Sequence, residues 1–183
     1  GLGDVYKRQP EEATQFTRAL KTVRHNPKHI LLSQGTQKEF YEGLGDDANG
    51  VIIMSAYHPK APFKGSLAGM QMNNADFAAE YHITTGNKPD EDVAITFALC
   101  QGIDQAVRAT GSVDDQTIMD WLHARTPEDP VKTVLGNFAW DDRGLPLGKS
   151  FLMVQWQNGG NLEFVYPTNE FDTAEIVDPK PQW

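Results

Sequence analysis

The chain has 183 residues, of which 39% are hydrophobic and 22% are charged, and its formal net charge is −9 at pH 7. This composition is typical of a globular protein with a core, and no apolar run approaches the roughly 18 residues of a transmembrane helix. The acidic balance argues against nucleic acid as a partner, because duplex binding requires clustered Lys and Arg. The single cysteine, Cys100, excludes an internal disulfide and a multi-cysteine metal site.

Residues 1–9 do not have the features of a natural N-terminus. They contain neither an initiator Met nor the apolar core of a signal peptide, and they resemble a translated adapter sequence. We expect them to be a non-native leader on a fragment of a longer protein. A missing signal peptide therefore gives no information about localisation.

The first third of the chain predicts alternating helices and strands. An amphipathic helix is expected over residues 11–24 and a short strand over residues 30–32, followed by a brief helix with the capping-box pair Thr36 and Glu39. The next strand contains four consecutive apolar residues, 51–54, which predicts that both of its faces are covered. The strand–helix–strand order predicts a right-handed crossover between parallel strands.

The middle of the chain predicts mostly helices. Residues 60–72 are rich in Gly and Pro and are expected to form an irregular loop, after which Asn74 is expected to cap a helix that ends near Ile83. The segment 93–107 has apolar residues on nearly every side of a helix. This pattern predicts a helix that is enclosed by protein.

The last third predicts one more helix and then a return to β-structure. Gly111 is expected to cap the long helix, and residues 133–140 are expected to be extended. Residues 151–156 and 162–166 alternate on either side of Asn158-Gly159-Gly160, which predicts an antiparallel hairpin. The fold class is therefore α/β, with a mostly helical middle.

The sequence contains no motif of a known catalytic or cofactor chemistry. It has no Gly-x-Ser-x-Gly elbow, Walker loop or dinucleotide-binding glycine motif. His25 and His29 are close in sequence, but Pro27 breaks the helix that would place both on one face, so surface histidines are favoured over metal ligands. Cys100 lies in the apolar helix, where a thiol packs as a small apolar group. We expect no enzyme, no cofactor and no metal site.

Polar and aromatic side chains follow the two predicted strands of the first third. Ser33 and Gln34 come after the first strand, and Tyr57 and His58 come after the second. Ligands of open α/β sheets bind outside the carboxyl ends of the strands, and these side chains suit a small polar molecule. Phe97 suits either a cleft or the core of its helix. Loop packing is the alternative for each of these residues.

Nine short motifs follow one another in the chain. They are Gly45-Asp-Asp-Ala-Asn-Gly-Val, Tyr57-His-Pro, Phe77-x-x-x-Tyr81, Gly86-x-x-Pro89, Ala106-x-x-Ala-Thr-Gly-Ser112, Thr133-Val-Leu-Gly136, Trp140-Asp-x-x-Gly144, Gln155-Trp-Gln-x-Gly159 and Val165-Tyr-Pro167. Their order and spacing resemble the carboxyl-terminal half of periplasmic solute-binding proteins of the leucine/isoleucine/valine-binding type. The resemblance covers residues 10–183.

This resemblance implies a fragment of the two-lobed type I periplasmic-binding fold, in which Rossmann-like lobes are joined by crossover strands and close on a ligand. Two crossings are expected, near residues 57–60 and 145–150. Residues 10–58 and 150–183 are then part of the second lobe. Residues 59–149 are part of the first lobe.

The resemblance also implies a function. The protein is expected to bind an amino acid of the branched-chain type or a related small polar solute in the periplasm, or elsewhere outside the cytoplasm, and to deliver it to the membrane permease subunits of an ABC transporter. Ser33 or Gln34 stands where the family has an acidic residue, which argues against strict specificity for branched-chain amino acids. Tyr57, His58 and Phe97 match cleft-facing positions of the family. The alternatives are a sensory module of the same fold that binds an amide or amino acid, and an α/β enzyme without its catalytic half.

Overall fold

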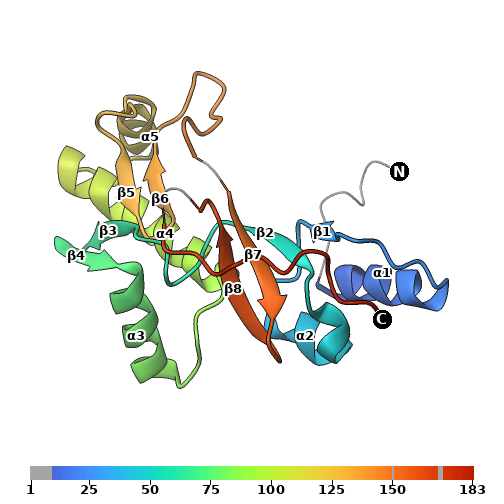
Figure 1. Ribbon diagram of the computed structural model, residues 1–183. Coiled ribbons are helices and arrows are strands. Elements are labelled where there is room, and N and C mark those ends of the chain that lie inside the picture. The colour runs from blue at the N-terminus through green and yellow to red at the C-terminus, as the bar shows by residue number, and fades with distance from the viewer. Residues whose placement is uncertain (1–9, 150, 169–170) are drawn as a thin grey trace. The chain divides into compact units, whose positions relative to one another are not determined.

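The computed structural model describes residues 10–149, 151–168 and 171–183 (Figure 1). Contacts divide the chain into two compact units, which we call unit 1 (Gly1–His58 and Phe151–Trp183) and unit 2 (Pro59–Ser150). The chain leaves unit 1 after His58 and returns to it at Phe151. The identification of these units with the two predicted lobes stays a prediction, and the predicted leader lies outside the described residues.

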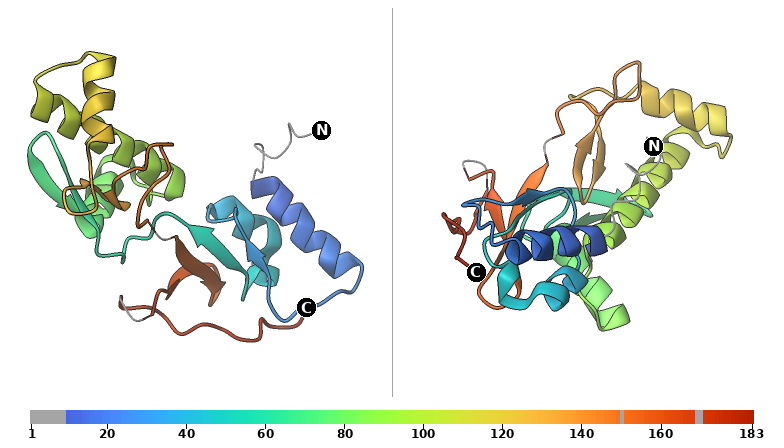
Figure 2. Two further views of the ribbon diagram at one scale, coloured as in Figure 1. Left: turned by 90° about the horizontal axis from the view of Figure 1, so that it is seen from above. Right: turned by 90° about the vertical axis from the view of Figure 1, so that its right-hand side faces the viewer.

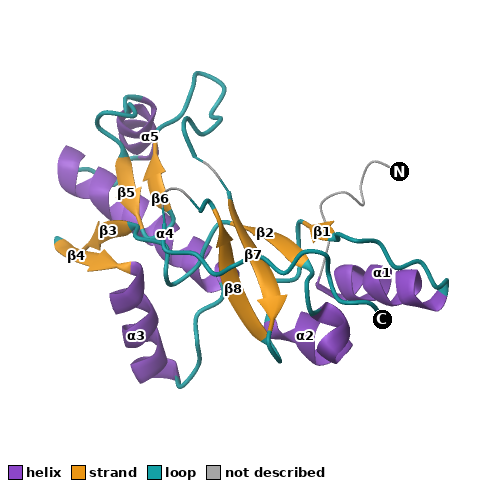
Figure 3. Cartoon of the chain, in the orientation of Figure 1, coloured by secondary structure: helices purple, strands orange, loops and turns teal. Residues whose placement is uncertain are grey.

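Unit 1 contains a four-stranded sheet with the strand order β1-β2-β7-β8 (Figure 3). β1 (Leu31–Leu32) and β2 (Ile52–Ser55) are parallel, as the strand–helix–strand order predicts. β7 (Leu152–Gln157) and β8 (Asn161–Tyr166) form the predicted antiparallel hairpin, and β7 also pairs with β2. The sheet is therefore mixed, and β1 and β8 are its outer strands.

The central strand β2 is buried less completely than its apolar run predicts. Val51 and Ile53 are fully buried, whereas Ile52 and Met54 are only half-buried. The prediction that both faces are covered was wrong, because alternate residues of a strand point to opposite faces and only one face is well covered by the described residues. An uninterrupted apolar run shows that both faces of a strand are suited to burial. Whether each face is buried depends on the elements that pack against it.

Two helices of unit 1, α1 (Pro10–Thr22) and α2 (Lys38–Leu44), lie side by side (Figure 2). Thr14 of α1 is buried, and a Cβ atom on Gly43 would lie 2.9 Å from its methyl carbon, so the glycine permits the close approach. A salt bridge connects the last turn of α1 to the short 3₁₀ helix η2 (Gly45–Ala48). The Lys21 Nζ lies 2.6 Å from the Asp47 Oδ2.

The two helices differ from their sequence-based predictions in detail. α2 begins at Lys38 with Gln37 as its N-cap, so the capping box of Thr36 and Glu39 was wrong by one position. The predicted apolar face of α1 is only partly buried: Ala13 is covered, but the side chain of Phe16 is 51% exposed. Thr14 and Thr17 are buried instead, because the helix turns its small residues toward α2.

Unit 2 combines three helices and two hairpins within the described residues. Its elements are β3 (Lys64–Leu67), β4 (Met70–Asn73), α3 (Asn74–Thr85), α4 (Glu91–Thr110), α5 (Asp115–His123), β5 (Val131–Thr133) and β6 (Gly136–Phe138). β3 pairs with β4, and β5 pairs with β6, each antiparallel. β2 and β5 lie in separate sheets, one in each unit.

Neither hairpin was predicted from the sequence. The segment 60–72 was expected to be irregular, but Ala68 and Gly69 have φ angles of 54° and 79° and form a tight turn between β3 and β4. The segment 133–140 was expected to be extended throughout, but it turns between β5 and β6. Ala is unusual at positive φ, so the first turn carries no recognisable signal.

The helix ends of unit 2 follow capping rules. Asn73, not the predicted Asn74, is the N-cap of α3, and its side chain accepts a hydrogen bond from the Asp76 N–H at 2.9 Å. Asn74 is buried and donates instead to the Ala61 carbonyl oxygen at 2.9 Å. Gly111 caps α4 in the left-handed conformation, as predicted.

The long helix α4 is covered on one face only. Ala94, Ala98 and Ala106 are buried, whereas Leu99 is 63% exposed and Cys100 is also exposed. The prediction of a fully enclosed helix, with Cys100 packed inside it, was therefore wrong. The apolar pattern shows that the second face is suited to burial, but no described element covers it.

Candidate functional site

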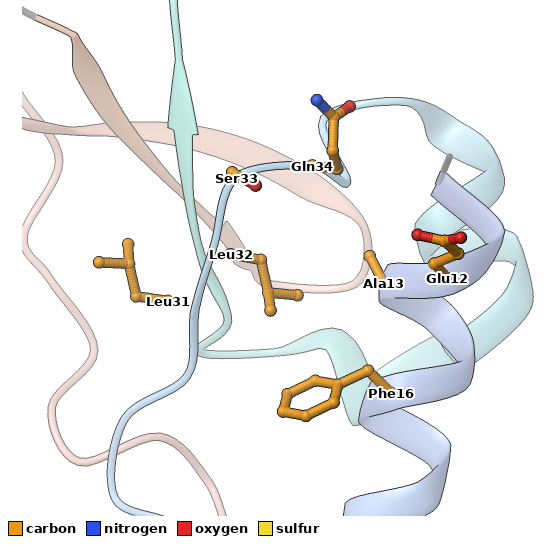
Figure 4. A pocket seen from close by; sticks show the side chains of 7 residues that line it. All are labelled: Glu12, Ala13, Phe16, Leu31, Leu32, Ser33 and Gln34. Atoms are coloured by element: carbon orange, nitrogen blue, oxygen red, sulfur yellow. The ribbon is translucent and has the colours of Figure 1, made fainter. Parts of the chain in front are cut away.

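Ser33 and Gln34 lie where β1 ends, at the rim of a pocket of about 340 Å³. The pocket lies between β1 and the first turns of α1 (Figure 4). Its lining residues are Glu12, Ala13, Phe16, Leu31, Leu32, Ser33 and Gln34. The three polar residues gather at one end of the pocket, and the apolar side chains continue along β1. The pocket therefore has a polar end and an apolar groove.

The polar end combines three kinds of hydrogen-bonding group. Ser33 contributes a hydroxyl and Gln34 an amide, each of which both donates and accepts, and Glu12 contributes a carboxylate. These groups suit a small solute with an ammonium or amide group. Sequence reasoning missed Glu12. The signal was available, because a helix that is connected to a parallel strand runs back along it and brings its first turn to the carboxyl edge of the sheet.

Tyr57 and His58 follow β2 at the same edge of the sheet, but both are buried inside unit 1. The His58 ring stacks on Phe164 with 5.3 Å between the ring centroids, and its Nε2 lies 3.2 Å from the Leu162 carbonyl oxygen. The expectation of surface histidines was therefore wrong for His58. Its ring fixes the end of β2 against β8.

Tyr57 is positioned by a local turn. The Ser55 hydroxyl donates to the Tyr57 carbonyl oxygen at 2.9 Å and lies 3.1 Å from the Tyr57 N–H, which donates to it. Burial raises the pKa of the Tyr57 phenol well above its ordinary value, so the group is neutral at physiological pH. The phenol is thus an uncharged group that can donate or accept a hydrogen bond.

Phe97 belongs to unit 2, where it lies on α4. It is half-buried and stacks on Phe77 with 4.5 Å between the ring centroids. It also lines a shallow apolar pocket of about 490 Å³ with Phe77, Tyr81, Asp92, Val93, Thr96 and Cys100. The structure thus brings together Ser33 with Gln34, and Tyr57 with His58, in unit 1, and it places Phe97 in unit 2.

A buried amine lies next to the point where the chain returns to unit 1. The Lys149 Nζ lies 5.0 Å from the centroid of Phe63 and 5.9 Å from that of Phe138. Burial lowers the pKa of this ammonium group to about 8, and the Glu91 carboxylate opposes the shift. The aromatic rings contact the last described residue of unit 2 before the crossing.

The described residues contain neither a cluster of metal-ligating side chains nor a membrane-spanning helix. No group of three or more His, Cys, Asp or Glu residues there could hold a metal ion. No helix within the described ranges has both the length and the apolar character to cross a membrane.

No protein-family model matches the chain, but curated relatives do. The Leu/Ile/Val-binding protein homolog 1 of Brucella suis and that of Brucella melitensis are each 29% identical to this chain over 138 residues, which cover 74% of this chain and 36% of theirs. The Leu/Ile/Val-binding protein homolog 2 of Brucella abortus is 23% identical over 138 residues. The chain therefore spans about a third of the length of these relatives.

Solved structures show the same likeness. The leucine-binding protein LivK of Thermotoga maritima has a TM-score of 0.65 and 21% identity, with 85% of this chain and 41% of that protein covered. The branched-chain amino acid binding protein LivJ of Streptococcus pneumoniae, in complex with isoleucine, has a TM-score of 0.64 and 16% identity, with 93% and 42% covered. An extracellular ligand-binding receptor of Rhodopseudomonas palustris has a TM-score of 0.66 and 15% identity, with 84% and 45% covered. These likenesses confirm the predicted fold class, part of a type I periplasmic-binding fold.

Proposed function

Because this chain is a relative of the Leu/Ile/Val-binding proteins, we propose that it is part of the substrate-binding component of an ABC transporter and that its whole protein binds an amino acid or a related small polar solute. The observation that carries this proposal is the match over 138 residues to proteins with that name, together with the shared fold. The relatives are named as binding proteins, not as enzymes. A periplasmic location and membrane permease subunits as partners belong to the same proposal.

The proposed ligand contacts of unit 1 lie where β1 and β2 end. Ser33 and Gln34 supply a hydroxyl and an amide at the pocket rim, and Tyr57 and His58 form the buried aromatic support behind the neighbouring strand. Phe97 is the proposed contact from unit 2. In the whole protein, units 1 and 2 belong to the two lobes, and ligand favours the closed form because it binds that form more tightly.

The proposed specificity is broader than for branched-chain amino acids alone. Ser33 and Gln34 are neutral, so they attract an ammonium group less strongly than the carboxylate that the family resemblance places there. Glu12 offers a carboxylate at the same end of the pocket, from α1. We therefore expect amino acids and amides to bind, with Glu12 contributing to the recognition of positive charge.

A sensory module of the same fold is the second candidate. One structural neighbour, from Rhodopseudomonas palustris, is named an extracellular ligand-binding receptor and not a transporter protein. The neighbouring genes distinguish the two functions. Permease and ATPase genes support transport, whereas a kinase or regulator gene supports signalling.

Calorimetry tests the binding function. The protein encoded by the complete reading frame that contains these residues is titrated with leucine, isoleucine, valine, phenylalanine, glutamine and asparagine. We expect saturable heat with at least one of them. A folded protein that gives no heat with any of them contradicts the proposal.

Variants then test the proposed contacts. Gln34→Ala is expected to weaken binding about tenfold, the effect of one lost hydrogen bond to a polar ligand. The matched control is Gln71→Ala, because Gln71 is exposed on β4 of unit 2. Equal affinities of the two variants would show that Gln34 does not contact the ligand, and they would not contradict the binding function.

A further inference from the structure

We propose that Asn158 is a site of spontaneous deamidation, which converts it to aspartate or isoaspartate, and that Asn49 is protected from the same reaction. Asn49 and Asn158 are the two asparagines of the chain that are followed by glycine. The proposal rests on the different surroundings of these two Asn-Gly pairs in unit 1. It concerns the chemical stability of the chain and does not depend on which solute the protein binds.

Deamidation of asparagine needs only the chain itself and water. The backbone nitrogen of the next residue attacks the side-chain carbonyl carbon Cγ and forms a new N–C bond. The side-chain nitrogen leaves as ammonia and takes up the proton that the backbone nitrogen gives up. Water then opens the cyclic succinimide to aspartate or to isoaspartate. A glycine in the next position favours the attack, because no side chain shields its nitrogen.

The Asn158-Gly159 pair lies in the turn between β7 and β8, where both residues are exposed (Figure 1). Among the described residues, neither the Asn158 side-chain amide nor the Gly159 N–H has a hydrogen-bond partner. The space around Gly159 is open, because a Cβ atom built on it would have no atom within 4 Å apart from its chain neighbours. No other contact therefore holds the two reacting groups apart.

The Asn49-Gly50 pair is held inside unit 1. The Gly50 N–H, whose nitrogen would attack, donates to the Trp156 carbonyl oxygen at 2.8 Å. Gly50 is buried, and a Cβ atom built on it would lie 2.7 Å from the Lys180 Cβ, so the C-terminal segment covers this residue. A reaction at Asn49 therefore requires a local opening that breaks the hydrogen bond to β7 and displaces the C-terminal segment.

The β7–β8 turn packs on an aromatic pair, so isoaspartate at position 158 acts beyond the turn itself. A Cβ atom built on Gly160 would lie 2.8 Å from the Tyr41 ring, and Tyr41 stacks on Trp156 with 5.5 Å between the ring centroids. Isoaspartate lengthens the main chain of the turn by a methylene group, whereas aspartate leaves the backbone unchanged. We therefore expect isoaspartate, but not aspartate, to disturb the packing of Tyr41.

Peptide mapping by mass spectrometry tests the proposal. The protein encoded by the complete reading frame is incubated at neutral pH, and the peptides that contain Asn49 and Asn158 are followed over time. We expect Asn158 to be lost at least about tenfold faster than Asn49, because a protected site reacts only in the small fraction of molecules that is locally open. Equal rates of loss, or no loss at Asn158, would overturn the proposal.

The same incubation in guanidinium chloride separates the fold from the local sequence. Unfolding exposes both Asn-Gly pairs, so we expect the two rates of loss to converge through a faster reaction at Asn49. A preference for Asn158 that is equally large in the unfolded chain would show that neighbouring residues set the rates. That result would overturn the structural argument.

Melting temperatures test the expected effect on Tyr41. Incubated protein that contains isoaspartate is expected to melt at a lower temperature than fresh protein. Fresh Asn158→Asp, which has the aspartate side chain and a normal backbone, is expected to melt with fresh protein. Asn158→Gln is incubated in parallel and is expected to keep its melting temperature. An equal fall in incubated Asn158→Gln would place the damage elsewhere and contradict the proposed effect of this turn.

Discussion

The two outer strands of the unit 1 sheet, β1 and β8, differ in whether other residues cover their free edges. At β8 the C-terminal segment covers the edge: the Ala174 N–H donates to the Phe164 carbonyl oxygen at 2.7 Å. The Phe164 ring is fully buried between His58 and Phe171, with centroid distances of 5.3 and 5.7 Å. At β1, Leu31 is exposed and no described strand pairs with its outer side. One edge of the sheet is thus covered by the C-terminal segment, and the other, at β1, is open among the described residues.

The C-terminal segment is fixed mainly by a buried polar network. The Gln155 amide nitrogen donates to the carbonyl oxygens of Gly50 and Val177, each at 3.0 Å. The Gln155 amide oxygen accepts from the Val177 N–H at 2.8 Å and from the Gln157 amide at 2.7 Å. Such a network is specific because each partner left alone would be buried without a hydrogen bond. The Gln155 side chain therefore links the C-terminal segment to β7 and to the residue before β2.

The largest expected effect is at the aromatic cluster of the closed edge. Phe164→Ala removes a fully buried ring and is expected to lower the free energy of unfolding by about 3–5 kcal/mol, measured by urea denaturation. Phe151→Ala is the matched control, because Phe151 is about half exposed, and we expect a cost of less than about 1 kcal/mol. Similar costs for the two variants would show that the β8 edge is not the tightly packed one.

A smaller effect is expected from the polar network. Gln155→Leu keeps the approximate volume but leaves the N–H and carbonyl groups of Val177 without their side-chain partner, at an expected cost of about 2–3 kcal/mol in unfolding free energy. The control is Gln15→Leu on the exposed side of α1. Proteolysis should also cleave the C-terminal segment faster in Gln155→Leu. An uncleaved segment would mean that other contacts hold it.

A still smaller loss of stability is expected from a hydrogen bond between β7 and the loop after β1. The Trp156 Nε1–H donates to the Gly35 carbonyl oxygen at 2.8 Å, next to Ser33 and Gln34. Trp156→Phe removes this buried hydrogen bond and is expected to lower the unfolding free energy by about 1–2 kcal/mol. Trp183→Phe is the control, since the Trp183 Nε1–H donates over 3.3 Å to Asp47 and is only part-buried. A larger loss in the control would contradict this assignment.

The smallest effect is expected at the open edge. In the 183-residue chain, Leu31→Lys should change the unfolding free energy by no more than about 0.5 kcal/mol, because the side chain is mostly in water. Thermal and urea denaturation both measure it. A loss as large as that of Phe164→Ala would show that Leu31 is already packed, and the contrast between the two edges would disappear.

Much of the architecture was predictable from local signals. The β7–β8 hairpin follows from alternation around a glycine turn, and Gly111 ends α4 because it adopts the left-handed conformation. The β3–β4 hairpin was not predicted, because Ala68 at positive φ is not a residue that marks such turns. Asn73 and Asn74 are adjacent, and sequence alone does not show which one caps α3.

Burial and the site were harder to predict than the elements. The apolar pattern of α4 indicates two faces suited to burial, but Leu99 is exposed because nothing among the described residues covers that face. The position of Ser33 and Gln34 after a strand was correct, because strand ends can be located from the apolar run before them. Glu12 was missed, although the antiparallel course of a helix connected to a parallel strand brings its first turn to the end of that strand.

The central claim, that these residues are part of a binding protein that closes on a small solute, is tested most directly by small-angle X-ray scattering. The protein encoded by the complete reading frame is measured with and without a saturating concentration of the amino acid that gives the greatest calorimetric heat. Closure predicts that the radius of gyration falls when the ligand is added. Identical scattering profiles with and without this ligand would contradict the claim.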